Sequence, residues 1–241
     1  HNIIKISKNK KNIFISNQHF ANIISVLSLR NIKNLKLILI DRNHLNELKN
    51  HDNFIRLLKN KILLFLIKFT YKKANAIVGI SKELCKDLSE YVGKNVFLIY
   101  NSALDDWSFK KINHKVKLSK KIFGKKIILN VGFFENQKDQ ITILKAINLL
   151  KSEFNNFHLI LVGRGSKYNE LQKFVKLNNL KNYVSFFRNI NNPNFFYKIS
   201  NLFVLSSKYE GFGNVVVEAL KHNCPVIISK CKSGPMEIIS N

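Results

Sequence analysis

Short apolar runs alternate with longer amphipathic runs along most of this 241-residue chain. We expect strands at residues 12–16, 35–40, 76–80, 96–100, 127–131, 158–162, 183–187, 202–205 and 225–228. Helices are expected between them at residues 21–29, 54–73, from Lys82 onward, 139–150, 167–177, 193–199 and 215–221. Apolar runs without polar alternation are typical of strands covered on both faces. Strands that alternate with helices indicate parallel α/β sheets.

The alternation is interrupted once, over residues 102–125. This stretch is polar, carries Asp105 and Asp106, and runs into a Lys-rich segment at residues 110–126. We therefore predict two Rossmann-like lobes that face each other, with residues 1–118 forming the first lobe and linker and residues 119–241 the second. Ligands bind such parallel sheets at the carboxyl ends of the strands, so functional residues should directly follow strands.

Composition narrows the class of protein. With 46% hydrophobic residues the chain is too apolar for a disordered tail. Its three Cys form no CxxC pair and its His residues lack metal-ligand spacing, so neither a disulfide scaffold nor a zinc site is predicted. No apolar stretch reaches the roughly 18 residues of a bilayer span, and the N-terminus lacks the order of a signal peptide. A reduced, cytoplasmic compartment is expected.

The net charge of +25 is spread over both halves of the chain. A compositional bias toward Lys explains it without any partner. A spread basic surface also attracts anionic membranes or nucleic acid. No RNA-binding aromatic motif, helix-turn-helix signature or zinc finger supports nucleic acid, which is therefore not expected as a partner.

Residues 210–219 form the sharpest motif. Gly211 and Gly213 allow a close backbone approach, and Asn214 is expected to cap the next helix, whose first-turn N–H groups then form an anion site. Glu210 and Glu218 flank this site with seven residues between them. Such a loop suits phosphate, ribose and sugar hydroxyls. An ordinary turn with an Asn cap and a first-turn Glu is the alternative.

This motif resembles the Glu-x7-Glu signature of retaining glycosyltransferases of family 4, which have the GT-B fold. Residues 74–81, 96–101, 130–139, 161–165 and 233–239 resemble the same family in order along the chain. The last of these segments is similar to a Gly-Pro-x-Glu-Ile-Ile loop of hexose and N-acetylhexosamine transferases. The resemblance implies an α/β protein of GT-B type whose two lobes are both incomplete, and the chain begins with His, so we expect both ends to be missing.

The resemblance implies a diphosphate site after the strand at residues 127–131. Gly132 would line the site, and Lys138 would neutralise charge as the leaving group departs; a solvated loop Lys is the alternative. Phe133 stands where the family usually has an Arg, so half of the cationic clamp would be missing or supplied by Arg164 or Arg188. Arg188 is expected near the nucleotide base, either stacked on it or simply exposed.

Within residues 210–219 the resemblance implies that Glu210 contacts the transferred sugar and Glu218 the ribose. The remaining implied donor-binding residues are Gly211, Phe212, Gly213 and Asn214. Retention is expected by front-face attack, in which the leaving phosphate accepts the acceptor's proton, so the two carboxylates need not straddle one bond as in a glycosidase. Glu237 either touches the donor or forms an N-terminal cap with Ser233. The resemblance implies no metal and no cofactor.

Arg42 and His44 directly follow a predicted strand and resemble an Arg-Asn-His stretch at the inter-lobe cleft. Either can face an acceptor phosphate or sugar, with a polar structural role as the alternative for His44. Ser81 either forms part of the cleft floor or caps a helix.

The predicted helix at residues 54–73 carries six basic residues beside its apolar positions, so it can sit on anionic lipid headgroups. A core-packed helix with a solvated basic face is the alternative. The run at residues 62–67 is apolar all round, which predicts burial between the sheet and a neighbour.

The resemblance, together with the α/β pattern, implies a retaining glycosyltransferase. It would move a hexose or N-acetylhexosamine from a nucleotide sugar, most often UDP-linked in this family, to a glycan or polyprenyl-linked acceptor in surface polysaccharide synthesis. The expected location is cytoplasmic, including the inner face of the cytoplasmic membrane. There are two alternatives: a catalytically inactive sugar-nucleotide-binding subunit and a basic nucleic-acid-binding α/β protein. Phosphorylases and epimerases share the fold, but the sequence does not mark the cofactor-binding Lys of a phosphorylase, and the epimerases use different catalytic residues.

Overall fold

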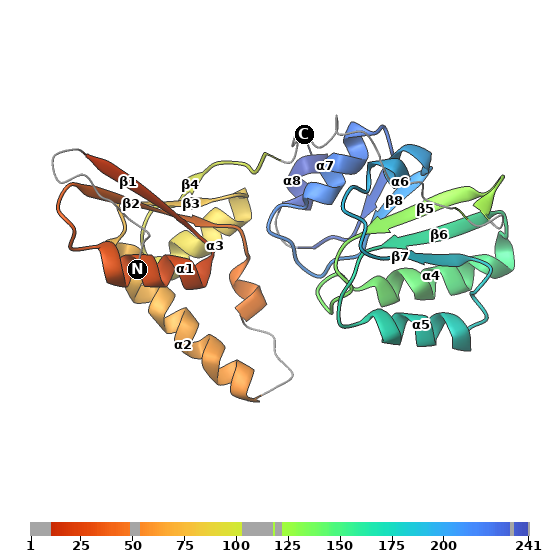
Figure 1. Ribbon diagram of the computed structural model, residues 1–241, viewed down its shortest axis with the longest axis horizontal. Coiled ribbons are helices and arrows are strands. Elements are labelled where there is room, and N and C mark those ends of the chain that lie inside the picture. The colour runs from red at the N-terminus through yellow and green to blue at the C-terminus, as the bar shows by residue number, and fades with distance from the viewer. Residues whose placement is uncertain (1–10, 49–53, 103–117, 119–121, 232–233, 241) are drawn as a thin grey trace.

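The computed structural model describes residues 11–48, 54–102, 118, 122–231 and 234–240. Two α/β lobes stand side by side, each built on its own parallel sheet (Figure 1). The predicted α/β class with two parallel sheets is therefore confirmed. Most of the predicted linker, at residues 102–125, lies outside the described residues.

The first lobe has a four-stranded parallel sheet in the order β1-β2-β3-β4. Its strands are β1 (Asn12–Asn17), β2 (Leu35–Asp41), β3 (Ala76–Gly79) and β4 (Phe97–Leu98). Its helices are α1 (His19–Leu29), α2 (Phe54–Thr70) and α3 (Lys82–Val92), with 3-10 turns η1 (Leu45–Leu48) and η2 (Tyr71–Lys73). One core cluster joins all three α-helices to the central strands, around the fully buried Leu39, Tyr71 and Ile77.

The predicted covering of both sheet faces is wrong for β1, whereas in β3 the consecutive residues 77–79 are all buried. In β1 the side chains alternate, and Ile13 on the outer face is 65% exposed. The predicted burial of residues 62–67 is also wrong: Phe65 is 61% exposed, while Ile67 is buried. The apolar run holds more apolar side chains than the single inward face of α2 can bury.

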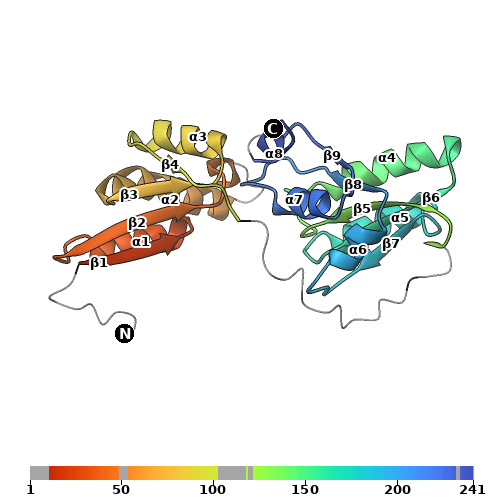
Figure 2. The ribbon, with the colours of Figure 1, turned by 90° about the horizontal axis from the view of Figure 1, so that it is seen from above.

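The second lobe has a five-stranded parallel sheet in the order β7-β6-β5-β8-β9. Its strands are β5 (Lys126–Val131), β6 (Phe157–Val162), β7 (Val184–Phe187), β8 (Leu202–Leu205) and β9 (Val226–Ile228). Its helices are α4 (Gln140–Glu153), α5 (Tyr168–Leu177), α6 (Asn194–Ile199), α7 (Asn214–Lys221) and α8 (Pro235–Ile239). Two separate cores, one with α4 and α5 and the other with α6 and α7, cover this sheet, and every residue of β6 is buried. Figure 2 shows the same arrangement from above.

The strand order reverses direction between β5 and β8. From β5 the chain first adds β6 and β7 on one side and then returns to add β8 and β9 on the other. Connections on the two sides of such a point leave the sheet in opposite directions and open a crevice at the carboxyl ends of the strands. The loops after β5 and β8 therefore meet at the edge of the sheet that faces the first lobe (Figures 1 and 2).

A buried polar cluster fixes the end of β2. His19 Nδ1 of α1 lies 2.7 Å from Asp41 Oδ1, and Asn22 Nδ2 donates to the Tyr71 hydroxyl at 3.1 Å. Burial acts to lower the pKa of His19, but the hydrogen bond and negative charge of Asp41 outweigh it, so the pKa is raised. This cluster anchors the backbone directly before Arg42.

The pair makes stability depend on pH. A raised His pKa stabilises the fold fully below the unfolded value of about 6.5, and that contribution is lost as the pH rises through the folded value. The free energy of unfolding should therefore decline as the pH rises above about 6.5 in the native protein, and this decline should be weaker in His19→Gln. Urea unfolding across this range measures it. An equal decline in both proteins would show that another group titrates.

Candidate functional site

Two loops are held together at the point where the strand order of the second sheet reverses. Residues 132–139 follow β5 and residues 206–213 follow β8. The Lys208 backbone N–H donates to the Gln137 carbonyl at 2.8 Å, and Gln137 Nε2 donates to the Tyr209 carbonyl at 2.9 Å. Ser206 Oγ donates to the Lys138 carbonyl at 2.7 Å. These bonds fix the two loops against each other and set the directions of their side chains.

Lys138 and Glu210 form an ion pair between these loops. Lys138 Nζ lies 2.6 Å from Glu210 Oε1, with side-chain exposures of 17% and 8%. Ser207 Oγ donates to the same carboxylate oxygen at 2.6 Å. Charge-assisted bonds of this length are stronger than neutral ones. The positive charge of Lys138 is thus held at the mouth of the crevice, with a carboxylate beside it.

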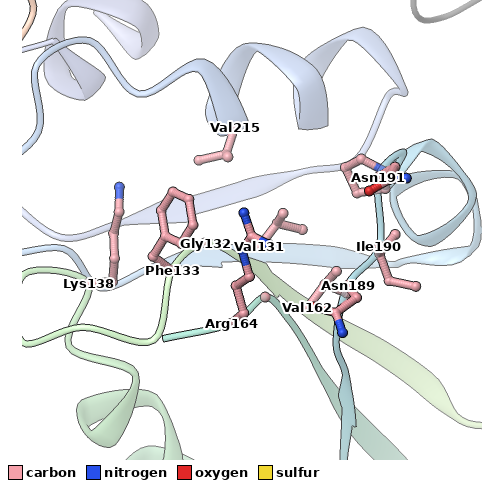
Figure 3. A pocket seen from close by; sticks show the side chains of 12 residues that line it. Val131, Gly132, Phe133, Lys138, Val162, Arg164, Asn189, Ile190, Asn191 and Val215 are labelled. Atoms are coloured by element: carbon pink, nitrogen blue, oxygen red, sulfur yellow. The ribbon is translucent and has the colours of Figure 1, made fainter. Parts of the chain in front are cut away.

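A pocket of about 430 Å³ opens on one side of this pair. Its lining residues are Val131, Gly132, Phe133, Lys138, Val162, Gly163, Arg164, Asn189, Ile190, Asn191, Pro193 and Val215. Figure 3 shows Lys138 and Phe133 at one end of the opening and Ile190 and Asn191 at the other. A Cβ on Gly163 would lie 1.9 Å from the Gly132 carbonyl oxygen, so only glycine lets β5 and β6 end this closely together.

A second pocket, of about 440 Å³, lies between the lobes. The first lobe contributes Arg42, Asn43, His44, Glu47, Ile80 and Asn101. The second lobe contributes Phe133, Gln137, Lys138 and residues 209–215. Lys138, Phe133 and Val215 line both pockets. The ion pair therefore stands at the junction of a pocket within one lobe and a pocket shared by two.

Most of the predicted site residues gather around these two pockets. Gly132 lines the first, Arg42, His44 and residues 210–214 line the second, and Lys138 lines both. Phe133 stands where the family usually has an Arg, and Arg164 and Arg188 were the two candidates for supplying that positive charge instead. Of these two, Arg164 lines the first pocket.

Two other predicted donor residues lie outside the lining of both pockets. Arg188 places its guanidinium 4.3 Å from the centre of the Tyr168 ring. Glu218 Oε2 accepts a hydrogen bond from the Tyr197 hydroxyl at 2.9 Å. Burial, followed by the charge and hydrogen bond of Glu218, raises the pKa of Tyr197 well above its usual value.

The predicted cap of α7 is wrong by one residue. Gly213, with φ of 92°, is the N-cap, and Asn214 is the first helical residue. A side chain at Gly213 would be strained at this φ, and its Cβ would lie 2.8 Å from Pro235 Cγ. Asn214 Oδ1 instead accepts a hydrogen bond from Asn101 Nδ2 of the first lobe at 2.9 Å.

For His44, Ser81 and Glu237 the sequence left a functional and a structural role open. His44 is buried and its Nε2 lies 3.1 Å from Asp87 Oδ2, so it has a structural partner as well as a place in the inter-lobe pocket. Ser81 caps α3, accepting a hydrogen bond from the Leu84 N–H at 3.3 Å. Glu237 lines neither pocket and instead contacts Lys82 of the first lobe. Its predicted cap with Ser233 is not tested, because Ser233 lies outside the described residues.

Sequence reasoning missed Glu47 and Tyr209. Both line the inter-lobe pocket, and burial raises the pKa of each, although the charge of Lys138 acts in the opposite direction on Glu47. Glu47 follows His44 by three residues in a turn after a strand, and Tyr209 directly precedes Glu210. Both residues lie in loops that follow strands, and this position was the sequence signal that could have identified them.

The described residues contain neither a metal-binding cluster nor a membrane-spanning helix. No group of three or more His, Cys, Asp or Glu side chains there can hold a metal ion. None of the helices in this part of the chain is both long and apolar enough to cross a bilayer.

Comparison with known proteins identifies the family. Residues 111–241, more than half of the chain, match the family described as Glycosyl transferases group 1. The chain belongs to this family. A glycosyltransferase of Methanocaldococcus jannaschii, MJ1059, is 32% identical over 98% of the chain and 60% of its own length. The capsular polysaccharide glycosyltransferase CapH of Staphylococcus aureus is 28% identical over 96% of the chain and 63% of its own length.

Solved structures of glycosyltransferases show the same fold. TarM of S. aureus, in complex with UDP and other ligands, has a TM-score of 0.71 and 22% identity, covering 98% of this chain and 45% of TarM. Anabaena HepE, in complex with UDP and glucose, has a TM-score of 0.73 and 18% identity, covering 94% of this chain and 61% of HepE. These neighbours establish the GT-B fold, and this family member spans roughly half to three fifths of the proteins it matches.

The ion pair predicts a specific pattern of stabilities in this family member. Lys138→Met leaves the Glu210 carboxylate buried without its cation and should cost about 2 kcal/mol of unfolding free energy. Glu210→Gln added to that variant removes the uncompensated charge and should restore most of the loss.

Urea unfolding of the two single variants and the double variant measures the coupling. Lys145→Met, at an exposed position of α4, is the matched control and should change stability little. Equal losses at the two Lys positions, or additive losses at Lys138 and Glu210, would contradict the pairing.

Proposed function

We propose that the protein containing this chain transfers a hexose or N-acetylhexosamine from a nucleotide sugar to a glycan or lipid-linked acceptor, with retention of anomeric configuration. The observation that carries the proposal is the Lys138–Glu210 pair at the junction of the two pockets. A cation suits a diphosphate, a carboxylate suits sugar hydroxyls, and the junction is where the two parts of a nucleotide sugar would meet. Family membership supports this chemistry.

The pair suggests how the donor would be received. A diphosphate entering the crevice would take Lys138 as its counter-ion, and the N–H groups at the start of α7 would add further donors. Glu210 would then exchange Lys138 for the hydroxyls of the transferred sugar. As the bond between the anomeric carbon and the phosphate oxygen breaks, Lys138 would stabilise the charge that develops on the diphosphate.

Retention follows from the face of the sugar on which the acceptor attacks. The acceptor oxygen would bond to the anomeric carbon on the face that the diphosphate leaves, and the acceptor proton would pass to the departing phosphate oxygen. The products are the glycosylated acceptor and the nucleoside diphosphate. No step requires a metal or a cofactor, and Arg164 is the residue proposed to supply the second positive charge.

We assign the nucleoside to the pocket of about 430 Å³ and the acceptor to the inter-lobe pocket. Glu218 would receive the ribose hydroxyls after releasing Tyr197, since the two are now hydrogen-bonded. UDP is the proposed nucleotide, and the UDP-bound structures of TarM and HepE support it. Arg42 would face a charged or sugar part of the acceptor.

The outer face of α2 supports binding to a membrane surface. Six exposed apolar side chains form one stripe along the helix: Phe54, Ile55, Leu58, Ile62, Phe65 and Phe69. Lys59, Lys61 and Lys68 flank the stripe in the sequence. An apolar stripe bordered by cations is typical of helices that lie in the headgroup region of anionic bilayers. A polyprenyl-linked acceptor, of the kind named for a Campylobacter jejuni relative, would be found at such a surface.

Nucleotide binding gives the first test. UDP, GDP, ADP and their sugars should be compared by thermal unfolding of the full-length protein, because a ligand at one hundred times its Kd adds about 2.7 kcal/mol of stability. We expect stabilisation by the UDP family, weakened in Glu218→Ala and retained in the exposed-site control Glu153→Ala. Stabilisation without any turnover would favour the inactive subunit. No stabilisation by any nucleotide would contradict the donor assignment and favour the nucleic-acid alternative.

Vesicle flotation tests the membrane surface separately. The full-length protein should float with vesicles rich in phosphatidylglycerol and much less with phosphatidylcholine alone. Phe65→Ser should weaken flotation several-fold, whereas Leu149→Ser, at an exposed position of α4, should not. Equal flotation of the two variants would exclude the α2 stripe as the contact.

A further inference from the structure

One carboxylate of the second lobe caps a helix of the first. Glu237 of α8 accepts the Lys82 N–H at 3.0 Å and the Glu83 N–H at 3.2 Å with its two oxygens. Ser81 accepts the third N–H, that of Leu84. The first N–H groups of a helix have no partner within it, so α3 completes its N-terminus with a side chain from the other lobe. A negative charge is also favoured at this end of the helix dipole.

The helix that carries Glu237 is packed directly on the site loop. A Cβ on Gly234 would lie 2.2 Å from Phe212 Cα, and the Gly213 Cβ position lies 2.8 Å from Pro235 Cγ. These contacts leave no space for the start of α8 to move independently of residues 211–213. A carboxylate that holds α8 therefore also holds the loop that carries Glu210.

The same loop meets the first lobe through its backbone. A Cβ on Gly211 would lie 1.9 Å from the Arg42 carbonyl oxygen, so only glycine permits this approach. The Tyr100 hydroxyl donates to Glu237 Oε2 at 3.2 Å, and the Tyr100 ring lies 5.9 Å from that of Phe212. Three contacts thus join the two lobes along one interface: the cap on α3, the Tyr100 contact and the approach to Arg42.

We propose that Glu237 is a positioning residue for sugar transfer, whose carboxylate latches the donor lobe onto the N-terminus of α3 and so places the Glu210 loop against the acceptor side at Arg42. The proposal rests on the proposed function for the transfer step, whereas the latch itself rests on the contacts above. Separation of the lobes would return Glu237 and the α3 N–H groups to water, where both are well solvated. The net gain from closure is then modest, which suits a latch that must open for product release.

Two variants remove the latch from opposite sides. Glu237→Gln keeps the side-chain length but removes the charge and one acceptor. Lys82→Pro removes a donated N–H at the first helical position, where proline is tolerated, and Ser81 before it already has the extended backbone that proline favours. Glu153→Gln, an exposed position at the end of α4, is the matched control.

The inter-lobe distance is the primary measurement. Spin labels at Lys33→Cys and Lys173→Cys, one exposed position on each lobe, report it in the full-length protein, and the three Cys of the chain described here are buried. We expect each latch variant to lower the ratio of closed to open molecules on the order of tenfold. The double variant should be no more open than the worse single one, because both remove the same interaction. Unchanged distances in Glu237→Gln, with the fold intact, would overturn the latch.

Kinetics separates positioning from donor binding. In Glu237→Gln the Kd for UDP should stay within twofold of the native value, while kcat/KM for transfer from a UDP-sugar falls in proportion to the closed fraction that the spin labels report. A parallel loss of UDP affinity would show that Glu237 binds the donor directly and would overturn the positioning role. If the native protein turns over no sugar nucleotide, the proposed function fails, and the distance measurement still decides the latch.

Discussion

The reversal of strand order between β5 and β8 is the constraint on which the site depends. It brings two loops together that lie about seventy residues apart in the sequence, and no local propensity would do so. Lys138 arrives on one loop and Glu210 on the other, and their ion pair spans the crevice that the reversal opens. Gly163 lets the ends of β5 and β6 lie close together, and Gly213 lets the loop after β8 pack against Pro235, since a side chain at either would collide with a neighbour.

The ion pair also explains how two charged groups are accommodated with little exposure to water. A lone carboxylate with 8% exposure would be costly, and so would a lone ammonium with 17% exposure. Paired, the two groups offset each other's cost of burial and hold each other in a fixed orientation. The inter-lobe interface follows the same logic, because Glu237 and the N–H groups of α3 satisfy each other across the boundary.

Much of the fold and part of the site could be predicted from the sequence. The strands were visible as short apolar runs, and the Gly-rich loop after β8 marked the edge where Glu210 and Lys138 meet. The cap at Gly213 was missed because Asn is the usual capping residue, whereas here φ of 92° and the contact with Pro235 require glycine. The exposed stripe of α2 was missed because apolar composition alone does not reveal what lies beside a helix. The contacts of Arg188 with Tyr168 and of Glu237 with α3 depend on tertiary placement that no local pattern encodes.

The proposed mechanism requires Lys138 to bind the diphosphate of a nucleotide sugar. Calorimetric titration of UDP and UMP into the full-length protein and its Lys138→Met variant tests it most directly, because the two ligands differ by one phosphate. The native protein should bind UDP more tightly than UMP, and Lys138→Met should remove most of this difference while leaving the affinity for UMP nearly unchanged. Equal losses of affinity for the two nucleotides, or no loss for UDP, would contradict the assignment.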